Sequence, residues 1–284
     1  MSPLRQQMQS DMVLRGFAAR TQQAYIAAVA AIAQHYHRSP DQLSQDDIQQ
    51  YLLHLINQRK LSWSSTNQAA CALRFLFRVT LGQAEAKFVI PYRKSASKLP
   101  EILSREEVAQ ILAASTNLTH HTLLMTTYAA GLRVAEVCAL RVADIDSERM
   151  MLRVVCGKGA KDRYTLLSPR LLDMLRLYWQ ASRPRTWLFP RRSDDSLPID
   201  IGNAQKMYYA AKKRAGITKE GGIHSLRHAF ATHLLEAGVD VHTIQRLMGH
   251  GHLSTTARYF HLKEQVAKTG SPLDLLPAID AISA

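Results

Sequence analysis

A basic segment bounded by two prolines divides this chain and restricts the folds open to it. Residues 91–100 read Pro-Tyr-Arg-Lys-Ser-Ala-Ser-Lys-Leu-Pro and contain no run of large apolar side chains. Proline fixes φ, lacks a backbone donor and pushes the preceding residue away from helical geometry, so a regular element through this segment is disfavoured. We therefore expect two domains, residues 1–90 and 101–263. The segment between them is either an extended linker that follows a phosphate backbone or a plain solvated loop.

The first domain is predicted to be helical throughout. Ser44 and Asp47, three residues apart, form a capping-box pattern that starts a helix. Apolar residues follow at positions that share one helical face, namely Ile48, Tyr51, Leu52 and Leu55. We also expect Thr21 to cap an earlier helix and residues 73–79 to supply the apolar face of a third.

The second domain is predicted to combine helices with a small β-sheet. Ser104 and Glu107 repeat the capping-box pattern near its start. Two short strands are expected at residues 150–156 and 163–167, joined by a glycine-containing turn. Further helices are expected at residues 169–182, 202–215, 225–237 and 240–248. The predicted fold class is therefore mainly α with a small β-sheet.

The chain carries a large positive charge, which indicates a polyanionic partner. Its formal net charge is +13. Residues 1–99 hold 12 Lys and Arg against 5 Asp and Glu, and the remainder hold 24 against 18, so both predicted domains are basic. Nucleic acid and an acidic membrane surface both attract such a protein.

Membrane insertion and secretion are not indicated by the sequence. No apolar run approaches the roughly 20 residues that cross a bilayer, and the N-terminal residues lack a hydrophobic signal core. Cys71, Cys138 and Cys156 are odd in number and scattered, as is typical of reduced cysteines. We expect a cytoplasmic protein with no membrane partner.

The segment from His224 to Tyr259 combines residue types suited to chemistry on a phosphodiester. His224 and Arg227 are three residues apart and share one face of a predicted helix. His250 follows Gly249, which is expected to end a helix in the left-handed conformation. Arginine grips phosphate oxygens, histidine transfers protons near neutral pH, and an activated tyrosine can form a covalent intermediate. Tyr259 could equally be a half-buried aromatic residue.

An upstream arginine completes a possible phosphate site. Gly131 is expected to break one helix, so that Arg133 falls near the start of the next, where an anion is favoured. Glu136, one turn on, could orient a catalytic side chain or simply suit the helix N-terminus. Taken alone, Arg133 is more often a surface residue.

A lysine at the predicted hairpin tip is the candidate general acid. Lys158 lies between two glycines, which allow close approach to a DNA backbone. It could contact phosphate, protonate a leaving oxygen, or be a solvated hairpin lysine. Lys161 and Arg163 compete for the same role.

Twelve histidines raise the alternative of a metal site. The chain has no His-Glu-x-x-His and no Cys-x-x-Cys pattern. We therefore expect neither a catalytic metal nor a cofactor, and we expect His228 and His233 to be structural.

Together, the order and spacing of these residues resemble the tyrosine recombinase, or phage-type integrase, family, in particular Xer-like site-specific recombinases. The pattern is an arginine, a hairpin lysine, His-x-x-Arg, Gly-His and a tyrosine nine residues after that histidine. The matching sequence segments are Ala130–Glu136, Gly157–Arg163, His224–Leu235 and Leu247–Tyr259. The resemblance implies an N-terminal helical core-binding (SAM-like) domain and a C-terminal α+β catalytic domain. It also implies that the tail, residues 264–284, docks on a neighbouring protomer, although packing in cis is the alternative.

The resemblance further implies a site-specific DNA recombinase, or integrase, typical of mobile genetic elements, with a phage, a transposon, an integron and a chromosomal system all open as its host element. Such an enzyme cleaves and rejoins strands through a 3′-phosphotyrosyl intermediate and a Holliday junction. The implied partners are double-stranded DNA recombination sites held by a homotetramer, with a dimer on each site and no cofactor. The implied catalytic residues are Arg133, Lys158, His224, Arg227, His250 and the nucleophile Tyr259. Relaxation of DNA by a type IB topoisomerase-like enzyme and DNA binding by a catalytically inactive protein remain as alternatives.

Overall fold

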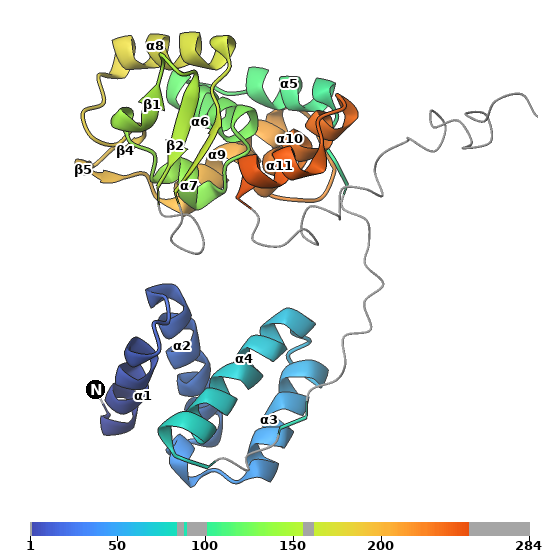
Figure 1. Cartoon of the computed structure of the whole chain (residues 1–284). Helices are drawn as coiled ribbons and strands as arrows, with labels where there is room; N and C mark the ends of the chain where they lie inside the picture. The colour runs from blue at the N-terminus through green and yellow to red at the C-terminus, as the bar shows by residue number, and fades with distance from the viewer. Residues whose placement is uncertain (1, 84–87, 90–100, 156–161, 250–284) are drawn as a thin grey trace, which may run out of the picture. The chain divides into compact units, whose positions relative to one another are not determined.

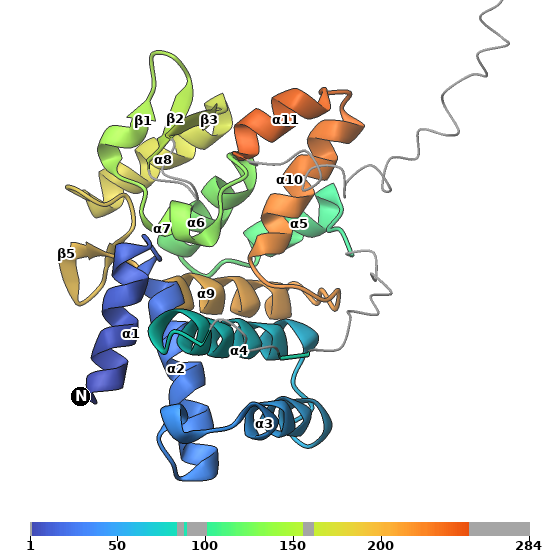
Figure 2. The same ribbon diagram turned by 60° about the horizontal axis from the view of Figure 1, so that its bottom comes forward.

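The computed structural model describes residues 2–83, 88–89, 101–155 and 162–249 (Figures 1 and 2). The chain separates into two compact units, Met1–Lys98 and Leu99–Ala284, each with its own buried core. Residues 90–100, Lys158, His250 and Tyr259 lie outside the described residues. No helix in the described part of the chain is both long enough and apolar enough to span a bilayer.

The described elements of the N-terminal unit are all helical (Figure 1). They are α1 (Pro3–Leu14), α2 (Ala19–Tyr36), the 3₁₀ turn η1 (Pro40–Gln42), α3 (Gln45–Asn57), α4 (Trp63–Phe75) and the π-helical turn η2 (Leu76–Thr80). The apolar stripe predicted on α3 is buried, and Ile48 and Leu52 have no exposed surface. They share one core with Met8 and Met12 of α1 and Leu73 of α4.

One of the two predicted helix starts in this unit is confirmed and the other is wrong. At α3 the Ser44 backbone N–H donates to Asp47 Oδ2 at 2.9 Å, and the Asp47 N–H donates to Ser44 Oγ at 3.1 Å. Thr21 does not cap α2, because the helix already begins at Ala19, after Ala18. Alanine and arginine are strong helix formers, so the helix extends upstream past the residue best suited to cap it.

The C-terminal unit combines helices with two small sheets, which confirms the predicted fold class. Helix α6 runs through the middle of the unit, with α5, α7, α8, α9 and α10 packed around it (Figure 1). The helices are α5 (Arg105–Ala113), α6 (Leu118–Ala129), α7 (Val134–Cys138), the 3₁₀ turn η3 (Val142–Asp144), α8 (Pro169–Ser182), α9 (Ile201–Arg214), α10 (His224–Glu236) and α11 (Val241–Met248). The strands are β1 (Ile145–Asp146), β2 (Met151–Val154), β3 (Arg163–Leu166), β4 (Pro190–Arg191) and β5 (Asp194–Pro198).

The larger sheet is antiparallel in the order β1-β2-β3, with Arg153 of β2 opposite Tyr164 of β3. The two predicted strands are present but shorter than expected. Strand β1 and the separate β4–β5 hairpin were not predicted. Asp194, Asp195 and Ser196 in β5 are all exposed, so this strand lacks the apolar alternation that marks a strand in sequence.

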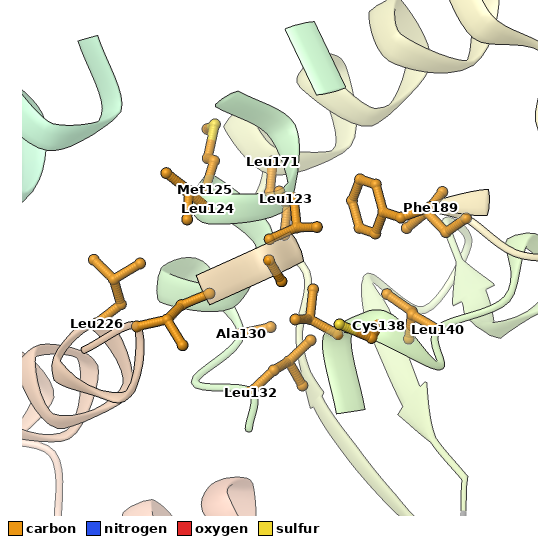
Figure 3. Close-up of a cluster of buried hydrophobic side chains, with 14 of the residues drawn as sticks. Leu123, Leu124, Met125, Ala130, Leu132, Cys138, Leu140, Leu171, Phe189 and Leu226 are labelled. Atoms are coloured by element: carbon orange, nitrogen blue, oxygen red, sulfur yellow. The ribbon is translucent and has the colours of Figure 1, made fainter. Parts of the chain in front are cut away.

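The core of the C-terminal unit holds the start of α7 and one face of α10 in place (Figure 3). Leu132, just before α7, and Leu226 on α10 are both fully buried in it. Cys138 of α7 also lies in this core, where burial raises the pKa of its thiol to about 12. The residues next to Leu132 and Leu226 in sequence, Arg133 and Arg227, are therefore brought to neighbouring positions by apolar packing.

Candidate active site

A left-handed glycine sets the position of Arg133. Helix α6 ends at Ala129, and Gly131 has φ +60°, which turns the chain so that Arg133 precedes α7, as predicted. A Cβ at position 131 would lie 2.3 Å from Cδ1 of Phe230, so a side chain is excluded by contact as well as by backbone conformation. The turn between α6 and α7 thus packs against Phe230 of α10.

Replacing Gly131 by alanine is expected to destabilise the C-terminal unit by about 2–4 kcal/mol, the sum of backbone strain and overpacking against Phe230. Calorimetric unfolding of the full chain measures the change. Gly202→Ala is the matched control, since no heavy atom lies within 4 Å of a Cβ built there and its φ is not positive. Equal unfolding midpoints for the two variants would contradict this account of the turn.

Glu136 forms the centre of the candidate site. Its side chain is 6% exposed and accepts hydrogen bonds from two arginines. The Arg133 backbone N–H donates to Oε2 at 2.8 Å, and Arg133 Nη1 donates to Oε1 at 2.7 Å. Arg227 Nη1 lies 3.6 Å from Oε2. Of the two roles expected for Glu136, the contacts favour that of orienting neighbouring side chains.

The surrounding guanidinium groups keep Glu136 ionised. Burial by itself raises the pKa of this carboxyl, but the hydrogen bond from Arg163, the backbone N–H of Arg133 and the nearby positive charges outweigh it. The net result is a pKa lowered from 4.5 to about 2. Three arginines thus surround one carboxylate, and the cluster keeps an excess of positive charge.

Arg227 is the most deeply buried of these arginines, at 1% exposure. It donates to the backbone carbonyl of Gly131 and, from α10, to that of Met248 at the end of α11. Arg133 donates to the carbonyls of Met248 and Gly249 at 3.4 and 3.2 Å, and its side chain remains 25% exposed. The structure therefore brings the two predicted arginines together, although they are far apart in sequence.

Arg163 belongs to the same cluster, which corrects the role considered for it from sequence. Its Nη1 and Nη2 donate to the two carboxylate oxygens of Glu136, each at 2.8 Å, and its Nε donates to the Leu247 carbonyl at 2.9 Å. All three nitrogens of the guanidinium are engaged, and the side chain is 11% exposed. Arg163 is therefore not a competitor of Lys158 for proton donation. The sequence offered no signal for its pairing with Glu136, which is 27 residues away.

His224 is the first residue of α10 and lies beside this cluster. Partial burial lowers the pKa of its imidazole, and the positive charges of Arg227 and Arg133 lower it further, against the opposing effect of Glu136. An imidazole kept neutral next to these guanidinium groups is able to accept a proton.

The other predicted site residues stay predictions, because Lys158, His250 and Tyr259 lie outside the described residues. The residue before His250 is described: Gly249 ends α11 with φ +61°, as expected for a left-handed cap. Figure 2 shows the end of α11 beside β3.

His233 has a structural environment. It is buried, and its ring nitrogens lie 2.8 Å from the Tyr128 hydroxyl and 3.0 Å from the Leu103 carbonyl. His228 packs edge-on against the ring of His224 at 5.0 Å between centroids. Within the described ranges, no three His, Cys, Asp or Glu side chains are grouped so as to hold a metal ion.

Comparison with known proteins gives matches along most of the chain. Residues 101–266 match the phage integrase family, and residues 4–85 match the N-terminal SAM-like domain of phage integrases. The y4qK protein of Sinorhizobium fredii is 46% identical over 98% of this chain and 90% of its own length. Tyrosine recombinase XerC of Lactobacillus delbrueckii subsp. bulgaricus is 31% identical over 88% and 91%. The solved structure of a lambda integrase(75–356) dimer bound to a COC′ core site matches with a TM-score of 0.72 and 18% identity, over 89% of this chain and 95% of that one.

Proposed function

This chain belongs to the phage integrase family and is a tyrosine-type site-specific DNA recombinase, and we propose that it exchanges strands through a 3′-phosphotyrosyl intermediate. The Tyr259 oxygen forms a bond to the scissile phosphorus while the bond from phosphorus to the 5′-oxygen breaks. His224 accepts the phenol proton, and Lys158 donates a proton to the departing 5′-oxygen. A 5′-hydroxyl of the partner duplex then attacks the phosphotyrosyl bond and releases the tyrosine.

The arginine cluster around Glu136 is the observation that carries this proposal. In the transition state, negative charge grows on the non-bridging phosphate oxygens, and fixed cations in a partly buried site stabilise it more than they stabilise the ground state. Arg133 and Arg227 are the proposed clamp on these oxygens, with His250 as a further hydrogen-bond donor. The excess of positive charge in the cluster supports this assignment.

The lowered pKa of His224 supports its role as proton acceptor. A protonated imidazole cannot take the tyrosine proton, so the ring must be neutral at the pH of the reaction. Partial burial favours the neutral form, and the neighbouring Arg227 and Arg133 favour it further by repelling another positive charge. In this proposal the cations of the site take the place of a metal ion, and no nucleotide takes part.

We further propose that recombination occurs in a homotetramer, with a dimer on each site and a Holliday junction between the two rounds of strand exchange. Residues 1–90 and 101–263 form the two DNA-contacting domains, residues 91–100 the linker, and residues 264–284 a tail that docks on a neighbouring protomer. The basic charge of both halves of the chain supports contact of each with DNA. The relative solved on DNA as a dimer at a core site supports two protomers on each site.

A covalent-capture experiment tests the proposed activity. Fragments of the source genome are incubated with the protein, and DNA that stays bound in detergent is sequenced to map the sites. A duplex of the mapped site, nicked next to the cleavage point, then traps the intermediate because the short leaving strand diffuses away. We expect a detergent-stable adduct on one strand, and strand exchange when two intact sites are supplied.

The outcomes separate the other functions open to this chain. Relaxation of supercoiled DNA without exchange between two duplexes would indicate a topoisomerase. Salt-dependent DNA binding without any adduct would indicate a binding protein. Either result would contradict the proposed recombination.

A further inference from the structure

Arg163 connects three separate elements of the C-terminal unit. It is the first residue of β3, it binds both carboxylate oxygens of Glu136 in α7, and it binds the Leu247 carbonyl in the last turn of α11. A planar guanidinium makes these three contacts with a fixed mutual geometry, which the point charge of a lysine does not reproduce. Arg163 thus sets the spacing between β3, α7 and the end of α11.

The end of α11 is shaped to receive this side chain. A Cβ at position 249 would lie 2.7 Å from Arg163 Cδ and 3.0 Å from its Nε. Gly249 is therefore required by the contact with Arg163 as well as by its φ of +61°. The carbonyls of Leu247, Met248 and Gly249 each accept a hydrogen bond from at least one of the clustered arginines. The three carbonyls that precede His250 in the chain are held by the same groups that surround Glu136.

Arg163 differs from Arg133 and Arg227 in its place relative to the proposed reaction. It lies five residues after Lys158 in sequence, and its partner Leu247 lies three residues before His250. Its Nε, Nη1 and Nη2 are all bonded to protein, and the proposed phosphate clamp is formed by Arg133 and Arg227.

We propose that Arg163 is a positioning residue for strand cleavage, which couples the strand that follows Lys158 to the helix end that precedes His250. This inference rests on the proposed function. It assigns the alignment of the general acid and of the hydrogen-bonding histidine to one side chain, whose guanidinium nitrogens are bonded to Glu136 and Leu247. Small displacements of catalytic groups cost rate much more than they cost binding.

The test compares binding with chemistry in Arg163→Lys, on the nicked duplex of the mapped site. The lysine keeps the positive charge, but it cannot reproduce the paired hydrogen bonds to both Glu136 oxygens together with the hydrogen bond to the Leu247 carbonyl. We expect the single-turnover rate of adduct formation at saturating protein to fall by about 10- to 100-fold. The dissociation constant for DNA should stay within about twofold of the wild-type value, because the proposed phosphate contacts are made by Arg133 and Arg227.

Arg153→Lys is the matched control. Arg153 lies on the neighbouring strand β2 and binds another buried carboxylate, Asp144, at 3.1 Å. Its replacement should leave the cleavage rate unchanged.

Gly249→Ala is the second test variant, since it keeps every charge but places a methyl group too close to the Arg163 side chain. It should slow cleavage in the same way, and the double variant Arg163→Lys/Gly249→Ala should be little slower than either single variant.

The results distinguish this inference from the function on which it rests. If wild-type protein forms no adduct, the proposed function and this inference both fail. If the wild-type adduct forms and both Arg163→Lys and Gly249→Ala react at the wild-type rate, this inference alone is overturned. It is also overturned if Arg153→Lys slows cleavage as much as Arg163→Lys does, because a general loss of structure would then explain both.

Discussion

Replacing Tyr259 by phenylalanine is expected to abolish the covalent adduct. The change removes a single oxygen, which in the proposed mechanism is the atom that bonds to phosphorus, and no other group can take its place at that position. DNA affinity should stay within about twofold, because binding depends on phosphate contacts from basic side chains. Detergent gels of the nicked duplex measure the adduct, and a gel-shift titration measures the affinity.

A second tyrosine in the same unit provides the control for this loss. Tyr209 on α9 is 54% exposed, and Tyr209→Phe should form the adduct at the wild-type rate. An adduct that persists in Tyr259→Phe would assign the nucleophile to another residue and contradict the proposed mechanism.

Replacing Glu136 by glutamine is expected to cost about 3 kcal/mol of stability at pH 7. The wild-type carboxyl has a pKa of about 2 against 4.5 for the unperturbed group, and that difference corresponds to about 3 kcal/mol. Removing one partner from a buried ion pair commonly costs about 3–5 kcal/mol, since the remaining charges stay buried without a counterion. Urea unfolding in a Trp63→Phe background measures the loss, because the remaining tryptophans, Trp179 and Trp187, both lie in the C-terminal unit.

The same ion pair predicts the pH dependence of stability. The folded-state pKa of Glu136 is depressed, so its contribution is fully present above about pH 4.5 and is lost as the pH falls towards 2. The free energy of unfolding should therefore fall more steeply with acidification in the wild type than in Glu136→Gln. Asp173→Asn, which changes an exposed carboxylate on α8, should leave the wild-type pH profile unchanged. Parallel profiles for wild type and Glu136→Gln would show that Glu136 does not contribute in this way.

Most of the features that could be predicted from the sequence depend on local signals. The capping boxes at Ser44 and Ser104 each complete themselves within three residues, and the structure contains both. The left-handed cap at Gly249 and the helix break at Gly131 could also be predicted, because each glycine follows the end of a helical pattern. Thr21 failed as a cap for a local reason too, since the residues before it favour helix as strongly as those after it.

Other features depend on contacts between residues that are far apart in the sequence. The β4–β5 hairpin lacks apolar alternation, so nothing in its own residues distinguishes it from a loop. The candidate nucleophile, the hairpin lysine and His250 were assigned from order and spacing, and these assignments stay predictions. From the sequence, Glu136 could either orient a catalytic side chain or simply suit the helix N-terminus, and only its contacts in the structure favoured the first role.

By itself, the sequence determined the fold class, the helix starts with local caps and the family, because these follow from short-range periodicity and from a characteristic order of residues. Only the tertiary structure decided which charged side chains pair with one another and which backbone carbonyls they bind. The pairing of Glu136 with Arg163 spans 27 residues, and the contact from Arg163 to Leu247 spans 84. Such contacts form when apolar packing brings α7, β3, α10 and α11 together, and a buried carboxylate then draws the nearest arginines to itself because it cannot stay unpaired away from water.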